Sequence, residues 1–168
     1  MLPLGSLVKV VATIGPLARV RLPGVAAGST PRRALRPAGG LAWSRRAFSR
    51  VVRQVVGAPY LWGGKSTFGF DCSGLVQAVM GEFGIRLPRD SGDQAVCGLP
   101  VGSLEDLEPF DLVFFGPSGA VDHVAIHLGD LNILHASGHV RTESLDPRRP
   151  AYRADLRRRF RWGRRVVP

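Results

Sequence analysis

The chain has 168 residues, of which 45% are hydrophobic and 21% charged, and its formal net charge is +10 at pH 7. This length suits one well-buried domain, the composition excludes a disordered chain or a coiled coil, and no apolar run approaches the roughly 18 residues of a membrane-spanning helix. The charge comes almost entirely from arginine, which is typical either of a surface that attracts polyanions or of ordinary solvated faces, so charge alone does not identify a partner.

The first 40 residues are expected to form β structure that packs on a larger unit. Residues 6–13 are rich in β-forming side chains, Gly15 and Pro16 interrupt them, and residues 17–22 alternate again. Residues 28–40 are rich in Gly, Pro and Arg and are expected to be a linker. Two strands bury too little surface to be stable alone.

The N-terminus shows no secretory signal. Residues 1–11 contain one lysine and a short apolar run, without the charged start, longer apolar block and small-residue cleavage site that a signal needs. We therefore expect no signal peptide in this sequence. Two compartments stay open, the cytoplasm, or export if the true start lies upstream.

Two amphipathic helices are predicted next. Ser44 opens the first, and Gly57 and Pro59 end it. A loop rich in Gly and aromatic residues then leads to a second helix, which begins near Asp71 and ends near Phe83. A short third helix is expected to start at Asp90-Ser91.

The hydrophobic period changes from helix to strand in the second half. Residues 111–115, 124–128 and 132–136 are predicted strands separated by Gly-containing turns. The basic tail, residues 152–167, is predicted to be a helix or an edge strand. Helices followed by strands predict an α+β domain with helices packed on an antiparallel sheet.

Cys72 is the candidate nucleophile. A thiol attacks an amide carbonyl as the thiolate, which a helix N-terminus and a nearby imidazole both stabilise. Cys72 lies at the predicted helix start, where free backbone N–H groups can also hold a developing oxyanion. Gly69 and Gly74 are expected to let a substrate approach the backbone closely. The other cysteine, Cys97, is expected to be a small buried apolar residue.

Two histidines are the candidate partners of this thiol. His123 opens one predicted strand and His135 lies on the next. A short turn at residues 129–130 pairs the strands antiparallel, so we expect the two imidazoles close together, the first as base and the second as its orienter.

Each of these residues also has a plainer interpretation. A single cysteine at a helix start is more often structural than catalytic, and a strand histidine is usually a surface or hydrogen-bonded core residue. A metal site built from Cys72, His123 and His135 is another alternative. These residues lack the paired ligand spacing of most zinc sites, so we expect neither metal nor cofactor.

The ordered set of motifs resembles the NlpC/P60 family of cysteine peptidases, with agreement from about residue 43 to the C-terminus, roughly three quarters of the chain. The matching motifs are residues 57–64 (GAPYLWGG), 69–76 (GFDCSGLV), 87–91 (LPRDS), 111–115 (DLVFF), 123–126 (HVAI) and 135–137 (HAS). The resemblance implies a papain-like α+β fold. It also implies cleavage of the γ-D-glutamyl bond to a diamino acid in peptidoglycan stem peptides.

The resemblance assigns a role to each matching residue of the catalytic set. Cys72 is implied as nucleophile, His123 as general base and His135 as the orienting third residue. Tyr60 matches a family tyrosine whose hydroxyl lies near the nucleophile and helps to bind or polarise the substrate.

Two further matches concern substrate binding. Asp71 and Ser73 match positions that, in members with an SH3-like domain, hold the free amine of an N-terminal L-alanine. A carboxylate beside an ammonium is favourable, and this binding would select released peptides over intact wall.

Residues 1–40 resemble part of a bacterial SH3-like domain. The similar stretches are residues 2–6 (LPLGS), 18–23 (ARVRLP) and 34–37 (ALRP). We therefore divide the chain into a partial SH3-like β segment with its linker, residues 1–40, and an NlpC/P60 catalytic domain, residues 41–168. The match covers less than a full barrel, so the segment is expected to be truncated or to begin upstream.

Two positions depart from the family pattern. Phe110 stands where the family has glycine, which places a bulky side chain in a turn. His127 stands where a tyrosine is common and is expected to be a packing residue. His139 is expected at the surface.

The leading hypothesis is a cysteine endopeptidase that acts on peptidoglycan-derived peptides. The alternatives are a non-catalytic wall-binding module, suggested by the basic surface and the SH3-like segment, and an amidase or acyltransferase of related fold. Nucleic-acid binding has no motif to support it beyond charge. The preferred diamino acid and the oligomeric state are not determined by the sequence.

Overall fold

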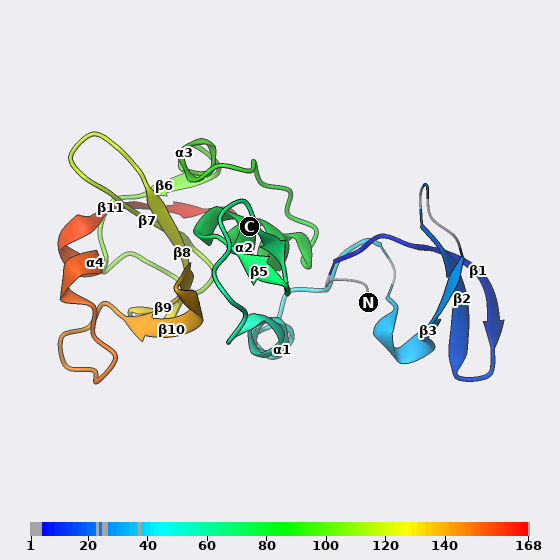
Figure 1. Cartoon of the computed structure of the whole chain (residues 1–168). Helices are drawn as coiled ribbons and strands as arrows, with labels where there is room; N and C mark the ends of the chain where they lie inside the picture. Colours follow the sequence, from blue (N-terminus) through cyan, green and yellow to red (C-terminus); the bar gives the residue numbers. More distant parts are fainter. Residues whose placement is uncertain (1–4, 23, 25–26, 37, 168) are drawn as a thin grey trace.

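A computed structural model describes residues 5–22, 24, 27–36 and 38–167. Figure 1 shows a small β-sheet at one end of the molecule and a larger α+β body at the other. In the part of the chain described, no helix has the length and apolar character needed to cross a membrane.

The small sheet contains the N-terminal strands in the antiparallel order β1-β2-β3. Its strands are β1 (Lys9–Ile14), β2 (Leu17–Arg21) and β3 (Gly28–Pro31), followed by a 3-10 turn, η1 (Arg32–Ala34). The expected linker is therefore wrong in part, because β3 pairs with β2, and that pairing leaves no signal in the local Gly/Pro/Arg composition. Residues 2–4, 23 and 37 of the SH3-like motifs lie outside the described residues, and the SH3-like assignment stays a prediction.

The segment after the small sheet is attached to the far end of the second helix of the main body. Arg36 forms an ion pair with Glu82, and the Leu41 N–H donates to the Glu82 carbonyl at 2.7 Å. Gly40 lies against the backbone of Phe83 and Gly84 so closely that a Cβ there would come within 2.7 Å of the Gly84 nitrogen. The small sheet is thus joined to the end of the helix remote from Cys72.

The predicted helices are confirmed. They are α1 (Arg45–Val55), α2 (Cys72–Gly81) and the short α3 (Ser91–Gln94). Ser44 caps α1 by accepting from the Ala47 N–H at 3.1 Å, and Asp71 caps α2 by accepting from the Gly74 N–H at 2.7 Å. The buried face of α1 consists of Phe48, Val51 and Val55.

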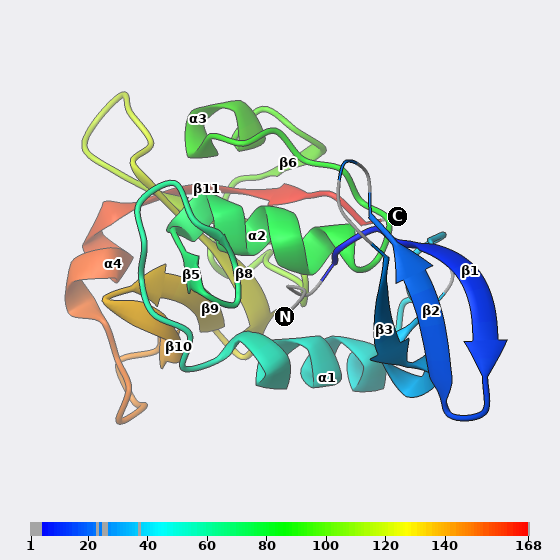
Figure 2. The same cartoon turned by 45° about the vertical axis from the view of Figure 1, so that its right-hand side comes forward.

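The main sheet has six strands in the order β10-β9-β8-β7-β11-β6, and every pairing is antiparallel. The strands are β6 (Leu99–Val101), β7 (Leu112–Phe115), β8 (His123–Gly129), β9 (Asn132–Ser137), β10 (His139–Ser144) and β11 (Phe160–Arg165), and α4 (Ala154–Arg159) precedes β11. A small hairpin, β4 (Lys65–Ser66) and β5 (Gly69–Phe70), lies in the loop before α2. Figure 2 shows α2 lying along the main sheet, where it contacts β8 and β9. The expected α+β architecture is confirmed.

Side-chain alternation gives the main sheet two buried faces. Val124, Ile126 and Leu134 pack with α1 and α2 in one hydrophobic cluster. Ala125 and Ile133, one position away, belong to a second cluster on the opposite face, which α4 covers through Leu156. Both faces are packed in hydrophobic clusters, so the sheet is a rigid support for side chains at its strand ends.

The basic tail forms both predicted elements, α4 and then β11, but β11 is not an edge strand. It lies between β7 and β6, with Trp162 opposite Phe114 and Gly163 opposite both Val113 and Val101. Its arginines are accommodated by hydrogen bonds to carbonyl and carboxylate oxygens: Arg164 Nε donates to the Ala95 carbonyl at 2.6 Å. The arginine-rich composition therefore gave no indication that β11 is an interior strand. Strands β6 and β10 were not predicted.

Phe110 adopts a turn conformation that is typical of glycine. Its φ is +82°, in the left-handed region that disfavours large side chains. Its ring packs at 4.5 Å from Phe48 and 5.0 Å from Trp43, measured between ring centroids. Aromatic packing thus offsets the backbone strain.

Candidate active site

Cys72 is the first residue of α2, and the loop before it is held tightly against this helix start. The Asp71 N–H donates to the Gly64 carbonyl at 3.1 Å. A Cβ on Gly74 would lie 2.1 Å from the same carbonyl, and a Cβ on Gly69 would lie 2.4 Å from the Leu61 side chain. The expectation that these glycines admit a substrate is therefore wrong, because the protein's own loop occupies the space.

The sulfur of Cys72 is half-buried at the meeting of α2 and β8. Burial raises the pKa of this thiol above its ordinary value, and the neighbouring Asp71 charge raises it further. Backbone N–H groups of Val124 and Ser73 donate to the sulfur and act in the opposite direction. The balance favours the protonated thiol at rest, in contrast to the thiolate expected from the helix start alone.

His123 and His135 come together as the strand pairing predicted. Nε2 of His123 lies 2.9 Å from Nδ1 of His135. Burial lowers the pKa of His123 to about 3, and the nearby His135, Arg159 and Arg153 lower it in the same direction. Burial also lowers the pKa of His135, against the opposing influence of Glu143. Both rings are neutral at physiological pH.

Glu143 extends this pair and was missed in the sequence. Its Oε2 lies 2.7 Å from Nε2 of His135 and accepts from Nη1 of Arg153 at 2.5 Å. The only signal that could have found it is strand alternation along β10, which the sequence did not reveal as a strand.

A second polar cluster lies next to Cys72 on the helix side. Asp71 accepts from Arg89 at 2.5 and 3.0 Å and from the Gly63 N–H at 2.9 Å, in addition to its capping bond. Nη1 of Arg89 also donates to Ser73 Oγ at 2.9 Å. Although burial raises the pKa of Asp71, these hydrogen bonds outweigh it and hold the pKa below its ordinary value. Arg89 lies in the 87–91 motif, but its contact with Asp71 and Ser73 was not predicted.

Tyr60 belongs to this cluster electrostatically. Burial raises the pKa of its hydroxyl, and the negative charge of Asp71, together with that of Cys72 in its thiolate form, adds to the effect. Its backbone N–H donates to the Gly138 carbonyl at 3.0 Å, which attaches the residue to the turn between β9 and β10. Tyr60 therefore presents a protonated hydroxyl, a hydrogen-bond donor, near the nucleophile.

A hollow of about 260 Å³ opens beside His123 and His135. Its charged walls are the ion pairs Arg159–Asp122, at 2.6 Å, and Arg153–Asp155, at 2.7 Å. Of these charges, those of Arg159, Arg153 and Asp155 act on His123. The charges near Cys72 come from the Asp71–Arg89 pair. The candidate catalytic residues thus lie between two polar clusters of different composition.

The remaining histidines and Cys97 stand apart from this arrangement. His127 is buried between the Glu108 carbonyl, 2.8 Å from its Nδ1, and the Leu131 N–H, which donates to its Nε2 at 3.2 Å. This packing role is the predicted one, and His139 is exposed as expected. Cys97 is a free, half-buried thiol at the edge of the core. Within the described residues, no three His, Cys, Asp or Glu side chains are grouped to hold a metal ion.

Comparison with known proteins relates this geometry to one family. A model of the NlpC/P60 family matches residues 57–159. A γ-D-glutamyl-L-lysine dipeptidyl-peptidase of Bacillus cereus is 35% identical over 148 residues, 76% of this chain and 44% of that protein. The peptidoglycan endopeptidase RipB of Mycobacterium tuberculosis is 38% identical over 124 residues, 64% of this chain and 51% of that protein. The chain spans about half the length, or less, of these curated relatives.

Solved structures agree with the sequence matches. The crystal structure of an NlpC/P60 family protein from Bacillus cereus superposes with a TM-score of 0.84 at 28% identity, over 96% of this chain and 54% of that chain. The structure of RipB from Mycobacterium tuberculosis superposes with a TM-score of 0.55 at 31% identity, over 74% of this chain and 66% of that chain. The first superposition covers so much of the chain that it includes the small N-terminal sheet.

Proposed function

This chain belongs to the NlpC/P60 family and has its papain-like fold, and we propose from that premise that it is a cysteine endopeptidase acting on peptidoglycan stem peptides. The bond proposed to be cut is the γ-D-glutamyl bond to a diamino acid. The observation that carries the proposal is the placement of Cys72 at the start of α2 against β8, the strand that carries His123, with His135 2.9 Å from His123. The relatives named above, a γ-D-glutamyl-L-lysine dipeptidyl-peptidase and a peptidoglycan endopeptidase, support the substrate class.

The proposed reaction starts from a neutral thiol and a neutral imidazole. As Cys72 Sγ bonds to the carbonyl carbon, His123 takes the thiol proton, which avoids forming a free thiolate in a buried site. The backbone N–H of Cys72, in the first turn of α2 where it has no intrahelical partner, and the Tyr60 hydroxyl are the proposed donors to the oxyanion.

Collapse of this intermediate breaks the C–N bond. His123 returns its proton to the departing amine, which leaves an acyl group on the Cys72 sulfur. A water molecule then attacks the thioester while His123 accepts a proton from that water, and His123 returns this proton to the sulfur as the C–S bond breaks. The products are the γ-D-glutamyl acid and the free thiol, so no external reactant other than water is consumed.

The cluster around Asp71 is proposed to bind the acyl side of the substrate. A γ-linked D-glutamate keeps a free α-carboxylate, and Arg89, with Ser73 beside it, supplies a positive charge and a hydroxyl near the nucleophile. The direct binding of an L-alanine amine by Asp71 and Ser73 stays a prediction. Both Asp71 oxygens already accept hydrogen bonds, so the geometry favours a role for Asp71 in holding Arg89 and the loop at Gly63.

The hollow beside His123 is proposed to receive the leaving diamino acid. Its arginines can bind a carboxylate and its aspartates can bind an ammonium. The exposed Arg159–Asp122 pair costs little to open, because such pairs contribute about 0–1 kcal/mol.

We also propose that residues 1–40 form an SH3-like segment and that residues 41–168 form the catalytic domain.

Mass spectrometry of the tripeptide L-Ala-γ-D-Glu-diaminopimelate incubated with the protein tests the proposal. Release of L-Ala-γ-D-Glu by the parent protein, and none by Cys72→Ala, is the expected result. Release by Cys72→Ala would exclude the mechanism. A parent protein that cleaves neither this peptide nor intact sacculi, but sediments with sacculi in a salt-dependent way, would instead support the wall-binding alternative.

A further inference from the structure

We infer that Glu143, held by Arg153, is a positioning residue that sets the tautomers of His135 and His123, so that the Nδ1 atom of His123 is left unprotonated to act as the base. The inference rests on the proposed function for its catalytic consequence. The tautomers themselves are a property of the resting protein and can be measured without any turnover.

The contact with Glu143 determines which nitrogen of His135 carries the proton. A neutral imidazole carries one N–H donor and one acceptor nitrogen, and an ionised carboxylate only accepts. Because Nε2 of His135 lies 2.7 Å from Oε2 of Glu143, the proton belongs on Nε2. Nδ1 of His135 is then an acceptor.

The contact with His135 in turn determines which nitrogen of His123 carries the proton. Nε2 of His123 lies 2.9 Å from the acceptor Nδ1 of His135, so Nε2 must carry the proton of the His123 ring. Nδ1 of His123 is left with a free lone pair. Without the carboxylate, the opposite arrangement becomes available, in which His135 donates from Nδ1 and His123 carries its proton on Nδ1. That tautomer cannot accept the thiol proton.

The register of β9 and β10 places Glu143 within hydrogen-bonding distance of His135. His135 pairs with Arg141 across β9 and β10, and Glu143 pairs with Ile133 two positions away, so His135 and Glu143 are diagonal neighbours on one face of the sheet. The His135 side chain is fully buried and that of Glu143 is 14% exposed. A carboxylate so shielded interacts strongly with its neighbours.

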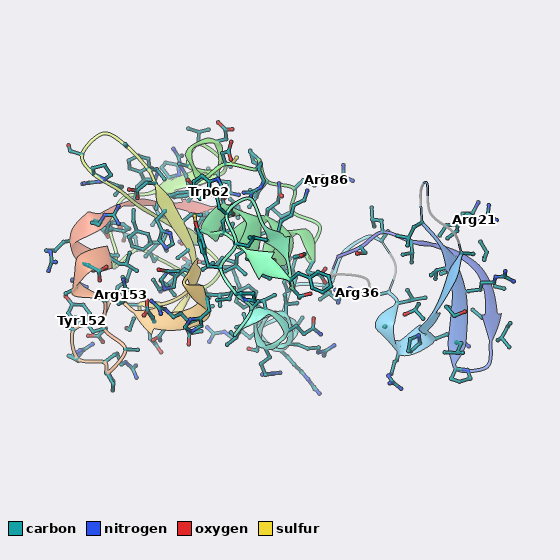
Figure 3. The ribbon with its side chains drawn as sticks, in the orientation of Figure 1. Arg21, Arg36, Trp62, Arg86, Tyr152 and Arg153 are labelled. Carbon is teal, nitrogen blue, oxygen red and sulfur yellow. The ribbon has the colours of Figure 1, made fainter. Side chains whose placement is uncertain are left out.

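Arginines on both sides fix the carboxylate of Glu143. Arg153 donates from Nη1 to Oε2 at 2.5 Å and from Nη2 to Asp155 at 2.7 Å, and Arg141 Nε lies 3.1 Å from Oε1 without hydrogen-bond alignment. Figure 3 shows Arg153 directed toward β10 from the chain that leads into α4. Arg153 therefore anchors the Glu143 end of the hydrogen-bond chain to an element outside β9 and β10.

Ring-nitrogen NMR on uniformly ¹⁵N-labelled protein tests the inference directly. In long-range ¹H–¹⁵N correlation spectra of the parent at neutral pH, His123 and His135 should both show a protonated Nε2 and an unprotonated Nδ1. His127 is an internal reference with the opposite tautomer, a protonated Nδ1 and an unprotonated Nε2. Its Nδ1 faces a carbonyl, and its Nε2 accepts from a backbone N–H. In Glu143→Ala, the His123 and His135 patterns should invert or average while that of His127 stays unchanged.

Glu143→Gln is a second variant that tests the inference even if Glu143→Ala does not fold. Its amide has nearly the same volume and can either accept from or donate to His135, so it should give a mixture of tautomers in a folded protein. A protonated Nδ1 on His123 in the parent would overturn the inference. So would parent-like tautomers in both Glu143 variants.

Kinetics separate this inference from the proposed function. If the protein cleaves the tripeptide, Glu143→Ala should lower kcat by about 10²-fold or more with KM nearly unchanged, and Glu143→Gln should lie between it and the parent. Glu105→Ala, an exposed glutamate on a distant loop, is the matched control and should equal the parent. An unchanged kcat in both Glu143 variants would overturn the positioning role. If the parent cleaves nothing, the proposed function fails, and the NMR result still decides the tautomers.

Discussion

Nε2 of His123 and Nδ1 of His135 lie 2.9 Å apart although the two residues do not face each other directly across β8 and β9. Ile126 pairs with Leu134, so the imidazoles meet along a diagonal on the sheet face away from α2. The diagonal leaves His123 at the strand end, next to Val124, whose N–H reaches the Cys72 sulfur. The His123 ring therefore contacts its orienter, and the residue next to it in the chain contacts the nucleophile.

The pH dependence of kcat/KM should lack the acid limb of an ordinary histidine. The pKa of His123 is lowered to about 3 and that of Cys72 is raised, so the neutral pair is the active form over the whole interval between them. We expect a flat profile from about pH 5 to pH 8 in tripeptide cleavage assays. A limb near the ordinary histidine value of 6.5 would contradict this.

Stability should fall as the pH falls below the ordinary histidine value. The unfolded chain binds the His123 proton near pH 6.5, whereas the folded protein binds it only near pH 3. Between these values the unfolded state holds more protons, so the free energy of unfolding decreases as the pH falls. Urea denaturation of the parent and of His123→Gln, compared at pH 7 and pH 5, should show a smaller pH-dependent loss in the variant. Equal losses would exclude His123 as a source.

Gly74→Ala should destabilise the protein and abolish activity. The added Cβ would lie 2.1 Å from the Gly64 carbonyl, so the loop must move away from the helix start and from Cys72. Gly81→Ala is the matched control in the same helix, since a Cβ there meets nothing within 4 Å. It should stabilise by about 0.5–1 kcal/mol through helix propensity. Thermal unfolding and tripeptide cleavage measure both, and a Gly74→Ala protein as active as the parent would contradict the loop contact.

Arg159→Ala should raise KM severalfold for a tripeptide ending in diaminopimelate, with little change in melting temperature. The Arg159–Asp122 pair is exposed, so its loss should cost at most about 1 kcal/mol of stability. Arg148→Ala, which removes an exposed arginine paired with the buried Asp146 away from the hollow, should leave KM unchanged. Equal KM values for the parent and the two variants would argue against a leaving-group site in the hollow.

Phe110→Gly should destabilise the fold by about 1–3 kcal/mol. Glycine relieves the strain at φ +82°, worth about 1 kcal/mol, but removes ring contacts with Trp43 and Phe48 that are worth more. Urea denaturation gives the difference. A more stable variant would show that strain outweighs packing in this turn.

Local chemistry determined much of this protein in advance. Ser44 and Asp71 could be predicted as helix starts because a cap acts on N–H groups only three residues away. The order of the motifs placed Cys72, His123 and His135 correctly on a helix start and two adjacent strands, and strand alternation was enough to bring the two imidazoles together.

What depends on distant partners was decided only by the tertiary structure. The position of β11 inside the sheet, the contact of Glu143 with His135 and that of Arg89 with Asp71 each join segments whose local composition carries no sign of the other. The protonation of the site is likewise nonlocal. A helix start alone predicts a thiolate at Cys72, but burial under β8 and the loop reverses that direction, because the desolvation of a charge depends on everything packed around it.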